Sequence, residues 1–160
     1  MGMESARAWL AARGFEDRIR EFDVSSATVE LAAQALGVEP GCIAKTISLY
    51  DGDSAMLILA AGDAKIDSHK FKEQFGFKAK MLAPEEALRL TGHAVGGVCP
   101  FAVPDTVRVC LDVSLRRFDT VFPACGSANS AIELTCEDLF AYSRAREWVD
   151  VCKSWREGEG

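Results

Sequence analysis

The chain has 160 residues, of which 49% are hydrophobic and 26% charged, and this indicates one globular domain rather than a two-domain enzyme. No apolar run approaches the roughly 18 residues of a membrane span, and the charged N-terminus is unlike a signal peptide, so we expect a cytoplasmic protein without a membrane partner. A net charge of −6 argues against a uniformly basic surface that coats DNA or RNA.

The N-terminal part of the sequence predicts two helices with a strand between them. A helix over 4–13 places Trp9 and Leu10 inward and ends at a glycine. A strand over 18–22 follows, and a second helix starts at a Ser26 or Thr28 cap and runs to residue 36. This second helix is expected to pack on a sheet.

Two apolar runs, 43–50 and 55–61, flank Asp51-Gly52-Asp53, and an Asp-Gly pair between such runs predicts a hairpin of central strands. The remaining predicted elements are a helix over 68–75, a strand over 78–82, a helix over 84–91, strands over 107–113, 120–123 and 131–134, and a helix from Thr135. Residues 147–152 suit a helix end or an edge strand.

Because helices alternate with hairpin-like strand pairs, a purely parallel sheet is excluded. We expect an α/β fold in which one domain, residues 1–156, has a mixed sheet surrounded by helices, with 157–160 as a disordered tail.

Positive charge gathers in one segment. Residues 61–80 contain five lysines against three acids, a local charge of +2 that leaves −8 on the rest of the chain. Lys65, Lys70 and Lys72 are therefore candidates to face phosphate groups, although a solvated helix face with mixed charges explains the pattern at least as well.

Six cysteines are widely spaced, with no CxxC pair and only two histidines in the chain. Zinc-site spacing is absent, so no metal site is expected, and buried thiols are favoured over disulfides.

Two features are candidates for chemistry. Gly96 and Gly97 belong to TGHAVGGVCPF (91–101), where adjacent glycines can present backbone N–H groups to an anion or carbonyl, although a plain connecting loop explains the segment as well. The pattern fits neither nucleotide-binding loop, so no cofactor is expected. Lys45 lies in an apolar strand, where it is either a sheet-edge side chain reaching water or a functional group.

The segments IAKTISLYDGDSAMLILAAGDAKID (43–67), TGHAVGGVCPF (91–101) and AIELTCEDLF (131–140) resemble, in order and spacing, the YbaK/EbsC family of aminoacyl-tRNA editing domains. The resemblance covers about 15–142 and implies that family's fold. It implies a free-standing, trans-editing deacylase that hydrolyses the ester of a mischarged tRNA carrying a small amino acid, such as alanine or cysteine on tRNA(Pro). The implied partners are prolyl-tRNA synthetase and the tRNA acceptor end, which Lys65, Lys70 and Lys72 are then expected to contact.

The resemblance places the family's functional lysine on Lys45 and its loop on 96–100, so Lys45, Gly96 and Gly97 are the expected catalytic groups. The expected substrate-binding residues are Phe22, Thr46, Val98, Cys99, Pro100, Gly126 and Asn129. Physically, loop N–H groups would stabilise charge that develops on the ester carbonyl oxygen, and the lysine would hold the ester or a phosphate.

The sequence departs from the cysteine-specific branch at three positions. Phe22 stands where that branch has an aromatic hydroxyl, Ala131 where it has an acid, and Cys99 where it has a loop serine. These departures weaken a cysteine-specific assignment. Two alternatives stay open: a noncatalytic module that binds tRNA or a synthetase, and a thiol-dependent hydrolase with Cys99 as nucleophile and His93 as base.

Overall fold

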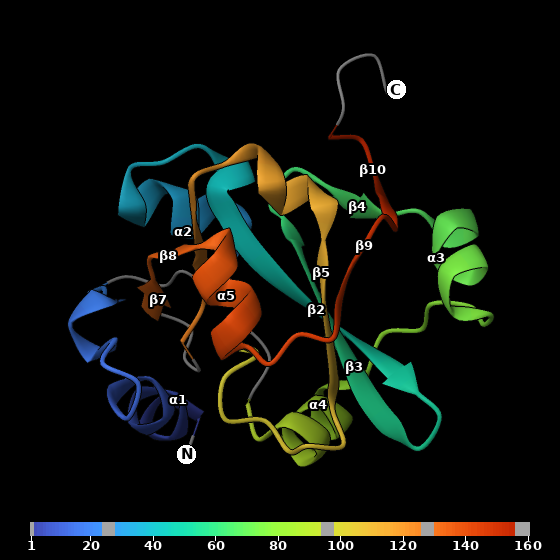
Figure 1. The fold of residues 1–160 in the computed structure, drawn as a ribbon, viewed down its shortest axis with the longest axis horizontal. Coiled ribbons are helices and arrows are strands. Elements are labelled where there is room, and N and C mark those ends of the chain that lie inside the picture. The colour runs from blue at the N-terminus through green and yellow to red at the C-terminus, as the bar shows by residue number, and fades with distance from the viewer. Residues whose placement is uncertain (1, 24–27, 94–97, 126–129, 156–160) are drawn as a thin grey trace.

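The computed structural model describes residues 2–23, 28–93, 98–125 and 130–155. Its main feature is a curled six-stranded sheet in the order β8-β6-β2-β3-β5-β9 (Figure 1). Parallel and antiparallel neighbours both occur in it, which confirms the predicted mixed sheet.

The predicted hairpin forms the centre of the sheet. Strand β2 (Ile43–Asp51) pairs antiparallel with β3 (Ser54–Ala61), and Lys45 lies opposite Ala60. Gly52 takes a φ of 64° in the turn, a backbone conformation that glycine adopts without strain. Residues 55–61 of β3 are all buried, so this strand is the middle of the core.

The outer strands extend the sheet on both sides of the hairpin. Strands β6 (Thr120–Pro123) and β5 (Arg108–Asp112) run parallel to β2 and β3, respectively. At the two edges lie β8 (Leu134–Thr135), antiparallel to β6, and β9 (Glu147–Val149), parallel to β5.

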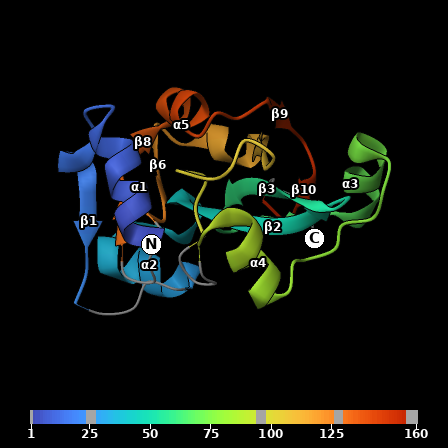
Figure 2. The same ribbon diagram turned by 90° about the horizontal axis from the view of Figure 1, so that it is seen from below.

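Helices cover both faces of the sheet. They are α1 (Gly2–Ala11), α2 (Val29–Leu36), α3 (Ser68–Phe75), α4 (Pro84–Thr91) and α5 (Cys136–Tyr142), with short 3-10 turns η1 (Glu16–Arg18), η2 (Pro40–Cys42) and η3 (Val113–Arg117). Seen from below, α2 and α4 lie on one face of the sheet and α5 on the other (Figure 2). Thr28 is the cap of α2, because its Oγ1 accepts from the Leu31 backbone N–H at 3.1 Å.

Two further strand pairs tie distant parts of the chain together. Strand β1 (Ile19–Glu21) pairs with β7 (Ser130–Ile132), and β4 (Lys65–Ile66) pairs with β10 (Cys152–Lys153). The second pair brings the C-terminal segment beside the turn that follows β3.

Three predictions about the elements are corrected or refined. The strand over 78–82 is wrong in extent: the segment makes one bridge, Met81 with Leu49. This bridge can form because β6 pairs with β2 only at Ile43 and Ala44, so the C-terminal part of β2 has a free edge. The strand over 131–134 divides into β7 and β8, and the ambiguous segment 147–152 contains the edge strand β9.

The cysteines are free thiols, as predicted, and four of the six are buried. Within the described ranges, no helix combines the length and apolar character needed to cross a membrane.

Candidate functional site

A cavity of about 310 Å³ lies where β2, α2 and the start of α4 meet the ends of β6 and β7. Small, hydroxyl-bearing and apolar side chains line it, together with Lys45. The lining residues are Thr28, Val29, Ala32, Ile43, Ala44, Lys45, Thr46, Ser48, Met81, Leu82, Pro84, Val98, Phe122, Ala124, Ser130 and Ala131. This volume lies near the lower end of the roughly 300–1,000 Å³ usual for small-molecule sites.

Lys45 supplies the one cationic side chain among the described residues of this lining. Its Nζ donates to the backbone carbonyl of Gly62 at 3.5 Å and also to that of Ala64. Both acceptors belong to the turn after β3, so the ammonium is held by backbone atoms.

Burial sets the electrostatics of this lysine. Loss of hydration lowers the pKa of Lys45 below its usual value, and the nearby Cys152, Asp63 and Glu30 oppose that shift. Lys65 adds to the lowering because it is another positive charge nearby.

Thr46 gives the cavity a polar group. Its Oγ1 is buried, and among the described residues it has no hydrogen-bond partner. Buried hydroxyls in folded proteins nearly always have a partner, so this one is available to a ligand. Ser48 lies two residues further along the strand and therefore shares the face of Thr46.

Of the loop predicted over 96–100, the structure describes residues 98–100. Val98 lines the cavity, whereas Gly96 and Gly97 lie outside the described residues, as do Gly126 and Asn129. Pro100 lines a separate hollow of about 90 Å³ beside Trp9. Phe22 is not among the described residues that line the Lys45 cavity.

Cys99 does not face a solvent-filled space. It is completely buried, and this burial raises the pKa of its thiol to about 12. Its Sγ lies 3.5 Å from Nε2 of His93, but that nitrogen also lies 2.8 Å from the Phe101 carbonyl oxygen. Because a carbonyl can only accept, Nε2 carries the proton and cannot take one from the thiol. This geometry argues against the thiol-dependent alternative.

The three lysines predicted to contact tRNA have different surroundings. Lys65 is exposed on β4 directly opposite Lys153 of β10, and Lys72 is exposed on α3. Lys70 is half-buried, and its Nζ donates to the Cys152 carbonyl at 3.1 Å and lies 3.5 Å from Asp150. Lys70 therefore also fastens the C-terminal segment.

Sequence reasoning missed several cavity residues. Ser48 could have been found from its spacing of two from Thr46, because side chains alternate along a strand. Met81, Leu82 and Ser130 reach the cavity through tertiary packing, for which the sequence has no local signal.

A larger hollow of about 680 Å³ lies on the α5 side of the sheet, lined by Phe140, Trp148 and Arg116 among others. Neither Lys45 nor Thr46 lines it. Among the described residues, no group of three or more His, Cys, Asp and Glu side chains is arranged to hold a metal ion.

Comparisons with known proteins identify the class. A family described as the aminoacyl-tRNA editing domain matches residues 24–142. The chain is 53% identical over 156 residues to the uncharacterized protein YwhH of Bacillus subtilis (strain 168), covering 97% of this chain and 99% of that one. The chain therefore belongs to the aminoacyl-tRNA editing domain family.

Two further similarities point toward prolyl-tRNA synthetase. A 91-residue stretch, 56% of this chain, is 32% identical to the proline–tRNA ligase of Lysinibacillus sphaericus (strain C3-41), of which it covers 16%. A crystal structure described as a candidate trans-editing enzyme for prolyl tRNA synthetase superposes with a TM-score of 0.84 at 30% identity, covering 94% of this chain and 96% of that one.

Proposed function

We propose that the chain is a free-standing deacylase that hydrolyses the ester between a small amino acid and the 3′ end of a mischarged tRNA. The observation that carries this proposal is Lys45, whose ammonium is held by two backbone carbonyls at the wall of a cavity; the Thr46 hydroxyl in the same cavity has no hydrogen-bond partner among the described residues. The activity is cytoplasmic, where tRNA is charged.

In the proposed reaction, a water molecule adds to the ester carbonyl carbon and the bond from that carbon to the ribose oxygen breaks. The water oxygen stays on the released amino acid, and one of the water protons goes to the leaving ribose oxygen, which becomes a hydroxyl. Negative charge develops on the carbonyl oxygen during the addition, and the Lys45 ammonium stabilises it. Gly96 and Gly97 are proposed to add backbone N–H donors to the same oxygen.

Thr46 is proposed to bind the aminoacyl group. Its buried Oγ1 can donate to or accept from a polar substrate atom that enters the cavity. Val98 supplies part of the apolar wall, and the next residue, Cys99, is a buried thiol that is proposed to support that wall without taking part in the chemistry. Pro100, Phe22, Gly126 and Asn129 stay predictions from the family resemblance.

The size of the cavity favours small amino acids. The available volume is about 310 Å³. Four of the residues that line it are alanines: Ala32, Ala44, Ala124 and Ala131. A substrate's terminal ribose must share this region with the side chain, so a bulky acyl group is expected to be excluded sterically.

The acceptor end is proposed to contact lysines beside the cavity. Lys65 and Lys153 lie directly opposite each other in the β4–β10 pair, an arrangement that is unfavourable for like charges. A phosphate between them would remove this repulsion, and Lys65 is near enough to influence Lys45. Lys70 and Lys72 on α3 add weaker contacts. Prolyl-tRNA synthetase is the proposed source of the mischarged tRNA.

A deacylation panel tests the function. The wild-type chain is incubated with alanyl-, cysteinyl- and phenylalanyl-tRNA(Pro), and release of the amino acid is followed beside an enzyme-free control. Hydrolysis of the alanyl or cysteinyl ester with little of the phenylalanyl ester is expected. Tight tRNA binding without hydrolysis of any ester would instead support the noncatalytic module.

A further inference from the structure

The turn after β3, residues 61–64, determines where Lys45 can place its ammonium. Its carbonyls at Gly62 and Ala64 accept from Nζ, and the turn is closed by a hydrogen bond from the Ala64 N–H to the Ala61 carbonyl at 2.9 Å. A backbone carbonyl cannot change rotamer as a side chain can. Any contact that fixes this turn therefore also fixes Lys45.

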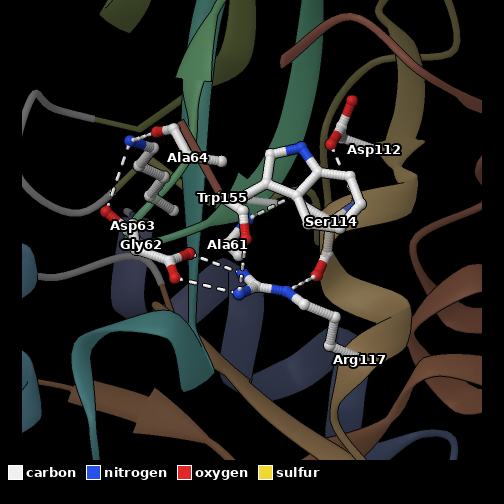
Figure 3. A network of polar contacts seen from close by, with 9 residues as sticks. Ala61, Gly62, Asp63, Ala64, Asp112, Ser114, Arg117 and Trp155 are labelled. Atoms are coloured by element: carbon white, nitrogen blue, oxygen red, sulfur yellow. Dashed lines mark hydrogen bonds and ion pairs between the residues drawn. The ribbon is translucent and has the colours of Figure 1, made fainter. Parts of the chain in front are cut away.

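One guanidinium, that of Arg117, joins this turn to two other parts of the chain. Its Nη1 and Nη2 donate to the two carboxylate oxygens of Asp63 at 3.0 and 2.5 Å. Its Nε donates to the Ser114 carbonyl at 3.0 Å, and Nη1 also donates to the Trp155 carbonyl at 3.3 Å (Figure 3). The planar fork of arginine suits this two-point contact with a carboxylate.

A buried chain of hydrogen bonds supports the same turn from within. The Ala61 N–H donates to Ser114 Oγ at 3.1 Å, and the Ser114 N–H donates to Asp112 at 2.9 Å. Asp112 also accepts from the Val151 N–H at 2.9 Å. The turn, η3 and the C-terminal segment thus form one connected unit (Figure 3).

We propose that Asp63 and Arg117 are positioning residues for Lys45: their ion pair fixes the two carbonyls that hold the ammonium at the cavity. Neither residue lines the described part of the cavity, so they act through the backbone of the turn. This inference rests on the proposed function for its effect on activity, but the anchoring of Lys45 is measurable without it.

The Arg117→Lys variant tests the paired hydrogen bonds of the guanidinium while keeping a positive charge beside Asp63. Lysine retains one positive charge beside Asp63 but loses the paired hydrogen bonds and the stacking of the guanidinium on the Trp155 and Phe118 rings, whose centroids lie 5.0 and 4.9 Å away. Because the charge is kept, a change at Lys45 reports the geometry of the turn.

The chain offers a matched control in Arg108 and Asp51. This pair is also two-pronged, at 3.1 and 3.0 Å, and its side chains are 29% and 21% exposed, compared with 30% and 39% for Arg117 and Asp63. Asp51 is the last residue of β2, at the end of the hairpin away from the turn that holds Lys45. Arg108→Lys should therefore loosen an equivalent ion pair without disturbing Lys45.

The first measurement is the pKa of Lys45 by competitive acylation with acetic anhydride over a pH series, with peptide mass spectrometry as readout. Burial lowers this pKa in the wild type, so an ammonium released toward water should show a raised pKa. We expect the rise in Arg117→Lys and none in Arg108→Lys. An unchanged or lowered Lys45 pKa in folded Arg117→Lys would overturn the proposal.

The second measurement is single-turnover deacylation. Displacement of the Lys45 ammonium should lower the single-turnover rate of Arg117→Lys at saturating protein by about tenfold. The protein concentration that gives half of the maximal rate should change by less than about twofold. Arg108→Lys should keep the wild-type rate, and equal losses in both variants would contradict a positioning role. If the wild type hydrolyses no mischarged tRNA, the proposed function fails, whereas the acylation measurement still decides the role of the ion pair.

Discussion

Gly62 is the position where a single methyl group should disturb both stability and the Lys45 site. A Cβ built on Gly62 would lie 2.0 Å from the Pro40 carbonyl oxygen and 2.6 Å from Cγ1 of Val29. Relieving the first contact to even 3.0 Å requires a relative movement of about 1 Å, and the obstacle is backbone rather than a flexible side chain. Gly62→Ala must therefore displace the turn that holds the Lys45 ammonium.

The expected cost is near the upper end for overpacking, about 3 kcal/mol in the free energy of unfolding. For a chain of this length, this corresponds to a fall in Tm of about 6–12 °C. Gly52→Ala is the control, because a Cβ there meets nothing within 4 Å and only the φ of 64° opposes it. That conformation costs alanine about 1 kcal/mol.

Urea unfolding and single-turnover deacylation of the two variants check this prediction. Gly62→Ala should lose about 3 kcal/mol of stability and more than about tenfold in rate, whereas Gly52→Ala should keep its rate within about twofold. If the free energy of unfolding of Gly62→Ala lies within about 0.5 kcal/mol of the wild-type value and the variant deacylates at the wild-type rate, the close packing of this turn does not control Lys45.

Three other variants probe the remaining parts of the proposed site. Thr46→Val should lower kcat/KM by about tenfold without loss of stability in urea unfolding, because the hydroxyl has no partner within the described structure; a wild-type rate would remove Thr46 from the site. The double variant Lys65→Ala/Lys153→Ala should make the slope of log affinity for tRNA against log salt concentration shallower by about 1.4, which is about 0.7 for each lost single-strand phosphate contact. An unchanged slope would mean that both lysines are solvated side chains without a phosphate contact. Cys99→Ser should stay active, and iodoacetamide at neutral pH should leave wild-type Cys99 unmodified because burial raises its pKa to about 12; rapid modification with loss of activity would restore the thiol mechanism.

Local chemistry made the central elements predictable from sequence. The hairpin follows from Asp51-Gly52 between two apolar runs, and two helix caps follow from Thr28 and Thr135. Lys45 was conspicuous because an ammonium is uncommon in an apolar strand. These signals need only residue types and spacing over a few positions.

The rest depends on contacts between segments far apart in the chain. No local pattern indicates that Arg117 meets Asp63, 54 residues earlier, or that Ser130 joins Thr46 at one cavity. The strand expected over 78–82 failed for the same reason, since its pairing depends on how much of the β2 edge β6 leaves open. Sequence spacing cannot supply that information.

The most direct test of the central claim is single-turnover hydrolysis of the preferred mischarged tRNA by Lys45→Ala and Lys45→Arg, each beside a thermal melt. Loss of one electrostatic stabiliser predicts a rate about 10²- to 10³-fold below wild type for folded Lys45→Ala. Lys45→Arg should also be impaired, because a planar guanidinium cannot replace a compact ammonium between the two carbonyls. A wild-type rate in folded Lys45→Ala would contradict the account, because hydrolysis would then not depend on the Lys45 ammonium.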